Sequence, residues 1–110
     1  MTADAGRGGE PSPYGLIGRI TAKPGQADAL AAALKAGTSA MPGCLSYIVS
    51  IDADQPDVLW IHEVWDSPAS HVASLAIPAV REAITVARPL ISAMERLATM
   101  RPVSGIAGSA

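Results

Sequence analysis

The chain has 110 residues, 49% of them hydrophobic, and a formal net charge of −2. This length supports one domain with a modest core, and no apolar run approaches the ~20 residues of a membrane-spanning helix. The basic residues are scattered along the sequence, which excludes an electrostatic footprint for nucleic acid.

The first part of the chain predicts a strand followed by a helix. Residues Met1–Pro13 are rich in Gly, Pro and Ala, lack the apolar segment of a signal peptide, and predict a disordered tail. Tyr14–Ala22 has the composition of a strand. Pro24 and Gly25 break this strand, and over Gln26–Gly37 apolar residues recur at the three- and four-residue spacing of a helix.

The central part predicts two strands joined by a hairpin, and then a helix. Cys44–Ile51 and Val58–Trp65 are rich in β-branched and aromatic residues, and the polar connection between them suits a hairpin. Ser67 is a favourable N-cap and Pro68 fits the first helical position. We therefore expect a helix from there to about Ala76.

The last part predicts a second helical piece and a final strand. Pro78 interrupts the preceding helix and fits the first turn of a new one, which runs to Arg88 before Pro89 ends it. Met94–Val103 is interpreted as a strand, although its composition also allows a helix. Residues 104–110 predict a tail, so the predicted domain spans residues 14–103.

The predicted order β-α-β-β-α-β is the split βαβ arrangement of a ferredoxin-like sheet, an α+β fold. Two helices cover only one face of such a sheet. The third strand is nevertheless apolar on both faces, with Leu59 and Ile61 on one side and Trp60 and Val64 on the other. Because such a strand requires cover on both faces, we expect a second copy of the chain on the open face, which predicts a homodimer.

Alternation along the third strand also separates its polar residues. Glu63 and Trp65 share the face of Ile61, whereas His62 points the opposite way. His62 and Glu63 therefore cannot bind a metal ion together, and one cysteine and two histidines are too few for a structural zinc site. The lone Cys44 excludes an intramolecular disulfide, which favours a reducing cytoplasm.

Two residues of this strand allow both a structural and a functional interpretation. Glu63 is either a rim charge paired with Arg19 or Arg96, or a pocket carboxylate able to take a proton. Trp65 is either a core anchor or the wall of a pocket for a flat aromatic ligand. The residues alone leave both alternatives open.

Three residues elsewhere carry groups that are common in active sites. His71 lies in the helix after the third strand, where the amphipathic pattern expects an apolar neighbour of Leu75. A lone histidine there is usually a satisfied core residue, but imidazole titrates near neutral pH and suits a general base. Arg81 is interpreted as an ordinary solvated arginine, and Cys44 lacks a base partner in the sequence, so we expect no nucleophilic role for it.

Several segments resemble one family of small enzymes. They are KPGQADAL after the first strand, the MPGC turn, and EVWDSPAS at the joint between the third strand and its helix. Together they are similar to the antibiotic-biosynthesis monooxygenase family, dimeric ferredoxin-like α+β barrels that include quinol and anthrone monooxygenases. The resemblance covers about Gly15 to Val103.

The resemblance implies roles for particular positions. Anthrone-oxidising members have a pocket Trp at the end of the third strand, a Tyr six residues later and an Arg in an LREAL-like helix. Here these positions are Trp65, His71 and Arg81, and the Asn that such members have on the third strand is Ile61.

Quinol-oxidising relatives carry histidines at the position of Ser74 and after the following Pro, where this chain has Ala79. Haem-degrading relatives need an Asn on the first strand and a Trp and a His in the helices, where the nearest positions here are Gly18, Ser74 and Ile84. Haem degradation is therefore not expected.

The resemblance implies a cofactor-independent monooxygenase, without metal or flavin, that oxidises a phenolic, quinol or polyketide-like aromatic substrate with molecular oxygen. Trp65 would stack on the ring, His71 would act as the base, and Arg81 would stabilise the resulting anion. The candidate substrate contacts are Glu63, Ile61, Tyr47 and Ser74. Two alternatives stay open, a non-oxidative isomerase or cyclase on the same barrel and a non-catalytic ligand-binding dimer.

Overall fold

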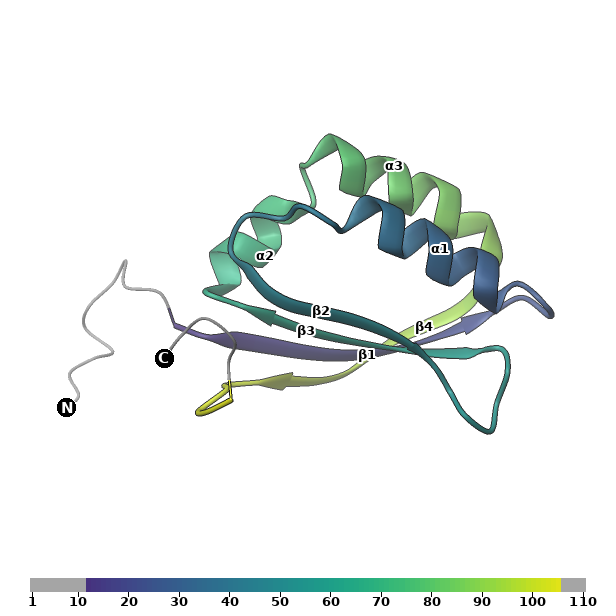
Figure 1. Ribbon diagram of the computed structural model, residues 1–110, viewed down its shortest axis with the longest axis horizontal. Helices are drawn as coiled ribbons and strands as arrows, with labels where there is room; N and C mark the ends of the chain where they lie inside the picture. The colour runs from purple at the N-terminus through teal and green to yellow at the C-terminus, as the bar shows by residue number, and fades with distance from the viewer. Residues whose placement is uncertain (1–11, 106–110) are drawn as a thin grey trace.

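A computed structural model describes residues 12–105 of the chain (Figure 1). The two predicted tails, residues 1–13 and 104–110, lie almost entirely outside these described residues. The elements follow the order β-α-β-β-α-α-β, which is the predicted ferredoxin-like arrangement with its second helical segment divided in two. The fold class predicted from the sequence is confirmed.

The sheet has four antiparallel strands in the order β2-β3-β1-β4. Three of the strands have the bounds that the sequence predicts. They are β1 (Tyr14–Ala22), β2 (Cys44–Ile51) and β3 (Val58–Trp65). Strand β3 lies in the middle of the sheet, between β1 and β2, which agrees with its apolar composition on both faces.

Strand β4 differs from its prediction. It spans Ile91–Met100, three residues earlier than the predicted Met94–Val103. It starts directly after a 3₁₀ turn at Arg88–Leu90 and pairs with β1 from Ala22–Ile91 to Gly15–Met100. The length of the partner strand therefore sets the bounds of β4, and composition alone does not contain that information.

The helices α1 (Ala27–Gly37), α2 (Pro68–Ser74) and α3 (Pro78–Ala87) all lie on one face of the sheet (Figure 1). Ser67 caps α2 as predicted, because its Oγ accepts a hydrogen bond from the Ser70 N–H at 3.2 Å. Between residues 12 and 105, no helix is long and apolar enough to cross a membrane.

The core between helices and sheet consists of two clusters. The larger cluster packs α1 against the middle of the sheet, and its buried members include Leu30, Leu59 and Ile61. The smaller one lies under α2 and the start of α3 and contains Met41, Trp65 and Val80. Tyr47 packs against both clusters, so this single side chain connects the two halves of the core.

The hairpin between β2 and β3 is held by the carboxylate of Asp52. Its Oδ1 accepts hydrogen bonds from the backbone N–H groups of Asp54 and Gln55, and its Oδ2 accepts one from Trp60 Nε1 at 2.8 Å. These hydrogen bonds, the one from Trp60 above all, hold the pKa of the Asp52 carboxyl below its usual range. The polar connection thus fixes the turn through one side chain.

The opposite face of the sheet carries no helix among the described residues (Figure 1). Its side chains include Ile17 and His62, which lie opposite each other, and Ile48, which lies opposite His62 on the other side. Arg19 forms an ion pair with Glu95 and lies 5.7 Å from the centre of the Trp60 ring. This face combines exposed apolar groups with paired charges.

The turn before β2 depends on Gly43. Its φ of +83° lies in the left-handed region, and its carbonyl oxygen accepts a hydrogen bond from the Asp66 N–H at 2.8 Å. A Cβ at this position would lie 2.5 Å from Ser70 Oγ and 2.8 Å from Asp66 Oδ1. The turn therefore requires glycine both for its backbone conformation and for the close approach of α2.

We predict that Gly43→Ala destabilises the fold more than Gly25→Ala does. Gly25 has a similar φ of +77° but no neighbour within 4 Å, so its substitution adds only backbone strain of about 1 kcal/mol. Gly43→Ala adds the same strain and a steric clash worth about 1–3 kcal/mol more. Urea denaturation measures the free energy of unfolding of both variants, and equal losses would contradict the close packing at Gly43.

Candidate functional site

A cavity of about 110 Å³ lies between the sheet and the helices, beside the smaller core cluster. Its lining comes from every layer of the fold. The residues with polar groups are Thr38, Tyr47, Glu63, Trp65, His71 and Ser74, and the apolar ones are Leu34, Met41, Leu75, Val80, Ala83 and Ile84. Leu75 is half exposed, so the cavity reaches the surface at the end of α2.

Glu63 is the acidic residue of this cavity. It lies opposite Leu16 and Tyr47 in the sheet, on the helix-covered face. Its Oε1 accepts a hydrogen bond from Trp65 Nε1 at 3.0 Å and lies 3.8 Å from His71 Nε2. One carboxylate oxygen thus faces both an indole N–H and an imidazole nitrogen.

The interpretation of Glu63 as a rim charge paired with Arg19 or Arg96 is wrong for Arg19, and the basic neighbour of Glu63 among the described residues is His71 instead. Arg19 lies opposite Trp60 and pairs with Glu95 on the open face, whereas Glu63 points to the helices. The side chain of Glu63 is only 18% exposed. The interpretation of Glu63 as a pocket carboxylate therefore agrees with its position in the structure.

His71 lies on the inner side of α2, and its side chain is 15% exposed. Its ring centre is 5.5 Å from that of Trp65, edge to face at 66°, and 5.9 Å from that of Tyr14. The two aromatic rings and the Glu63 carboxylate restrict the orientation of the imidazole. Trp65 is 1% exposed and also lines the cavity, so it is at once a core anchor and a pocket wall.

The contact between Glu63 and His71 defines which imidazole nitrogen is available. Nε2 faces the carboxylate at 3.8 Å, longer than a hydrogen bond, and such contacts commonly shorten when a ligand closes the site. A carboxylate on one side of an imidazole favours a proton on that nitrogen. Nδ1 is then the nitrogen that can accept a proton from a ligand.

Tyr47 and Cys44 surround the same carboxylate from strand β2. Burial raises the pKa of the Tyr47 phenol far above its usual range, and the Coulombic effects of Glu63 and Cys44 add to this. Burial likewise raises the pKa of the Cys44 thiol, a hydrogen bond to the Ser46 carbonyl lowers it, and Glu63 raises it. Both groups therefore stay protonated near neutral pH and act as hydrogen-bond donors.

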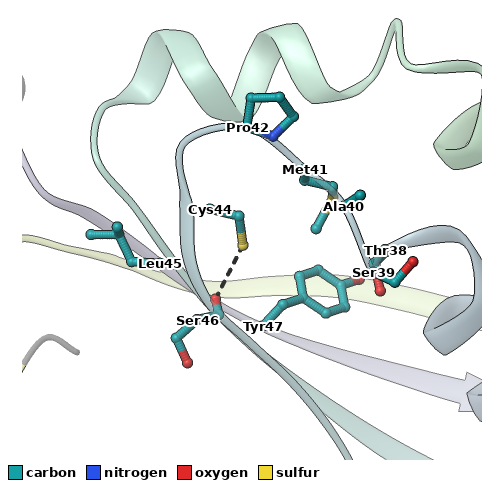
Figure 2. A pocket seen from close by; sticks show the side chains of 9 residues that line it. All are labelled: Thr38, Ser39, Ala40, Met41, Pro42, Cys44, Leu45, Ser46 and Tyr47. Carbon is teal, nitrogen blue, oxygen red and sulfur yellow. Dashed lines mark hydrogen bonds between the residues drawn. The ribbon is translucent and has the colours of Figure 1, made fainter. Parts of the chain in front are cut away.

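A β-bulge explains why Cys44 lies near the site. The pairing between β2 and β3 shifts by one residue between Cys44 and Ser46, so Cys44 lies opposite Trp65 and Tyr47 opposite Glu63. In Figure 2 the Cys44 sulfur and the Tyr47 ring lie beside the loop Thr38–Pro42, and the dashed line is the 3.5 Å hydrogen bond to Ser46. Strict alternation along β2 does not predict this arrangement.

The structure brings together five of the seven predicted site residues. Trp65, His71, Glu63, Tyr47 and Ser74 all line the cavity, and the Ser74 hydroxyl donates a hydrogen bond to the His71 carbonyl at 2.6 Å. The other two predicted residues lie elsewhere. Ile61 belongs to the larger core cluster, and Arg81 is exposed on α3, so neither is among the residues that line the cavity.

The sequence interpretation missed two groups of residues. Thr38 and Met41 line the cavity from the loop before β2, and a loop has no periodicity that would assign them a side. Tyr14 contacts the His71 ring, and it lies opposite Trp65 in the sheet. This pairing with Trp65 would have indicated that Tyr14 lies on the cavity side of the sheet, because directly opposite residues of antiparallel strands share a face.

Comparison with known proteins identifies the family of the chain. Residues 13–86 match the family described as antibiotic biosynthesis monooxygenase. The chain belongs to this family. A crystal structure of a candidate antibiotic biosynthesis monooxygenase from Chloroflexus aurantiacus J-10-fl is 56% identical, covering 86% of this chain and 96% of that one, with a TM-score of 0.83.

More distant structures share the fold of this family member. A protein from Pseudomonas aeruginosa is 24% identical over 88% of this chain and all of its own, with a TM-score of 0.75. A candidate monooxygenase from Nitrosomonas europaea is 12% identical over 84% of this chain and 92% of its own, with a TM-score of 0.77. No curated protein matches the chain.

The environment of Cys44 predicts a slow reaction of this thiol. Cys44 is the only cysteine. Because its pKa is raised, a smaller fraction of this thiol than of free cysteine is in the reactive thiolate form at a pH of about 8. We expect a chromogenic disulfide reagent to modify the folded protein more slowly than free cysteine. Glu63→Gln should speed the reaction, because it removes one of the causes that raise the pKa, and denaturation should abolish the difference. A folded protein that reacts faster than free cysteine would contradict this assignment.

Proposed function

We propose that the chain is a cofactor-independent monooxygenase that oxidises a phenolic, quinol or polyketide-like aromatic substrate with molecular oxygen. The observation that carries this proposal is the convergence of His71, Glu63 and Trp65 on one cavity in a member of the antibiotic biosynthesis monooxygenase family. A base, a group that orients it and an aromatic wall are what a phenolic ring needs in order to be bound and ionised.

The reaction begins with a proton transfer to the protein. His71 accepts the proton of the phenolic hydroxyl, and the phenolate gives one electron to oxygen. The resulting superoxide and substrate radical combine to form a carbon–oxygen bond at a ring carbon that carries hydrogen, and the peroxide anion takes back the proton held by His71. The hydroperoxide then loses that hydrogen as a proton and its outer oxygen as hydroxide, which leaves a carbonyl and one water. One oxygen atom enters the product, and all four electrons for reduction of oxygen come from the substrate.

The lining residues would support this sequence in different ways. Trp65 provides a flat wall for the ring, and Glu63, 3.8 Å from Nε2 of His71, would orient the imidazole. The neutral Tyr47 hydroxyl can donate a hydrogen bond to the substrate oxygen as negative charge develops there. The role of Arg81 as an anion stabiliser rests on the resemblance alone.

We predict that His71→Ala lowers kcat/KM for oxygen uptake with a hydroquinone by about 10²–10⁴, the range for loss of a general base. Glu63→Gln should lower it by a smaller factor, because Glu63 acts only by orienting the base. His62→Ala is the matched control, because His62 is the only other histidine and is exposed on the opposite face of the sheet.

An oxygen electrode measures all of these variants with the same substrate. Unchanged uptake in His71→Ala would refute the proposed base, and a loss in His62→Ala of similar size would show that the effect is not specific to the cavity. Arg81→Ala in the same series decides whether this exposed arginine takes part. Binding of the substrate without oxygen uptake in the wild type would instead favour a ligand-binding protein.

We also propose that two copies of the chain associate through the open faces of their sheets. The described helices cover only the other face, and the open one presents Ile48, which is 50% exposed, beside Ile17 and Trp60. Exposed apolar side chains on a sheet face without helices are typical of an interface between proteins, and His62 and the Arg19–Glu95 pair lie among them.

The dimer proposal predicts different effects for two similarly exposed residues. Ile48→Asp should shift the protein from dimer to monomer, because it places a charge in the proposed interface. Val86→Asp, at 48% exposure on the outer side of α3, should leave the dimer intact. Sedimentation at micromolar concentration distinguishes these outcomes, and a monomeric wild type would refute the proposal.

A further inference from the structure

The size of the cavity limits what it can hold. Its volume is about 110 Å³, whereas an apolar protein cavity of about 150 Å³ takes one benzene molecule. Typical sites for drug-sized ligands measure about 300–1,000 Å³. A single ring whose edge lies in the mouth beside Leu75 therefore fills the cavity, and two or three fused rings exceed it.

Much more space lies beside the cavity, in grooves that share some of its lining residues. Two outer grooves flank strand β2, with volumes of about 540 and 530 Å³. The first is the groove of Figure 2, lined by residues 38–42 and 44–47, and the second lies between the C-terminal part of α1 with the following Thr38 and Ser39 and residues 47–49 of β2. Thr38 and Tyr47 line both grooves and the cavity as well.

Tyr47 is the larger of these two shared residues and forms the partition. Its ring extends from β2 towards Thr38 and Ser39 (Figure 2) and packs against both core clusters. Its position is fixed by pairing with Glu63 in the sheet. Because Tyr47 is the largest of the shared lining residues, removal of its ring should widen the cavity towards the grooves while His71, Glu63 and Trp65 keep their identity.

We propose that Tyr47 restricts the site to substrates with a single aromatic ring, such as a simple phenol or hydroquinone, and excludes fused-ring phenols. The oxidation of that ring rests on the proposed function, whereas the size limit on binding does not. A hydroquinone and oxygen would yield a hydroxyquinone and one water, which conserves atoms and electrons. Tyr47 is in this proposal the residue that determines specificity for ring number.

The test measures binding in the absence of oxygen, so that turnover plays no part. Phenol, 2-naphthol and 2-hydroxyanthraquinone present one, two and three rings with the same hydroxyl group. The chain has two tryptophans, and only Trp65 lines the cavity, whereas Trp60 lies on the opposite face. Ligands in the cavity should therefore shift the NMR signal of the Trp65 indole N–H and leave that of Trp60 unchanged.

We expect the wild type to bind phenol in the cavity and to bind the three-ring ligand there more weakly. Tyr47→Ala should raise the affinity for 2-hydroxyanthraquinone relative to phenol by about tenfold or more, which corresponds to ~1.4 kcal/mol. Tyr47→Phe is the matched control, because it keeps the ring and should keep the wild-type order. Tyr47→Leu provides a smaller opening with more of the core packing retained, in case Tyr47→Ala does not fold.

Two results would overturn the proposal. One is a wild type that binds the three-ring ligand in the cavity at least as tightly as phenol. The other is an unchanged affinity ratio in the folded Tyr47→Ala or Tyr47→Leu variant. Oxygen uptake is then measured on the same proteins, and its absence with every ligand would refute the proposed oxidation while the order of binding still stands.

Discussion

The two-residue period of strand β3 determines most of what this molecule can do. Because β3 lies inside the sheet, each of its side chains belongs either to the layer under the helices or to the open face. Glu63 and Trp65 fall in the first layer, and Trp60 and His62 in the second. A shift of one residue in register would exchange the two sets, placing the carboxylate in the open face and emptying the cavity of its acid.

The fold was largely predictable from sequence for reasons that are local. The residue composition of β1, β2 and β3 is itself typical of strands, and turns with Pro, Gly and Asp end them. Their bounds therefore agree with the prediction. The bounds of β4 depend on its pairing with β1, a contact between distant parts of the chain. Helix α2 shows the same distinction, since its start is fixed by Ser67 but its predicted end at Ala76 is two residues late.

The site was predictable only in its residue types. Alternation placed Glu63 beside Trp65 on one face, and the family resemblance added His71, but the contact of one carboxylate oxygen with both partners requires the packing of α2 onto the sheet. The bulge that turns Cys44 towards Trp65 breaks the alternation on which such predictions rest. Membership in the antibiotic biosynthesis monooxygenase family fixes the scaffold, while the reaction depends on these contacts.

The turn at Gly43 has a mechanical consequence for the site. Its carbonyl holds the N–H of Asp66, and Ser70 packs against its Cα, so the loop that carries Thr38 and Met41 is fastened to the first turn of α2. His71 follows Ser70 directly. The loop that lines the cavity and the helix that carries the imidazole therefore share one anchor, and a substitution that breaks it at Gly43 would disturb both sides of the site.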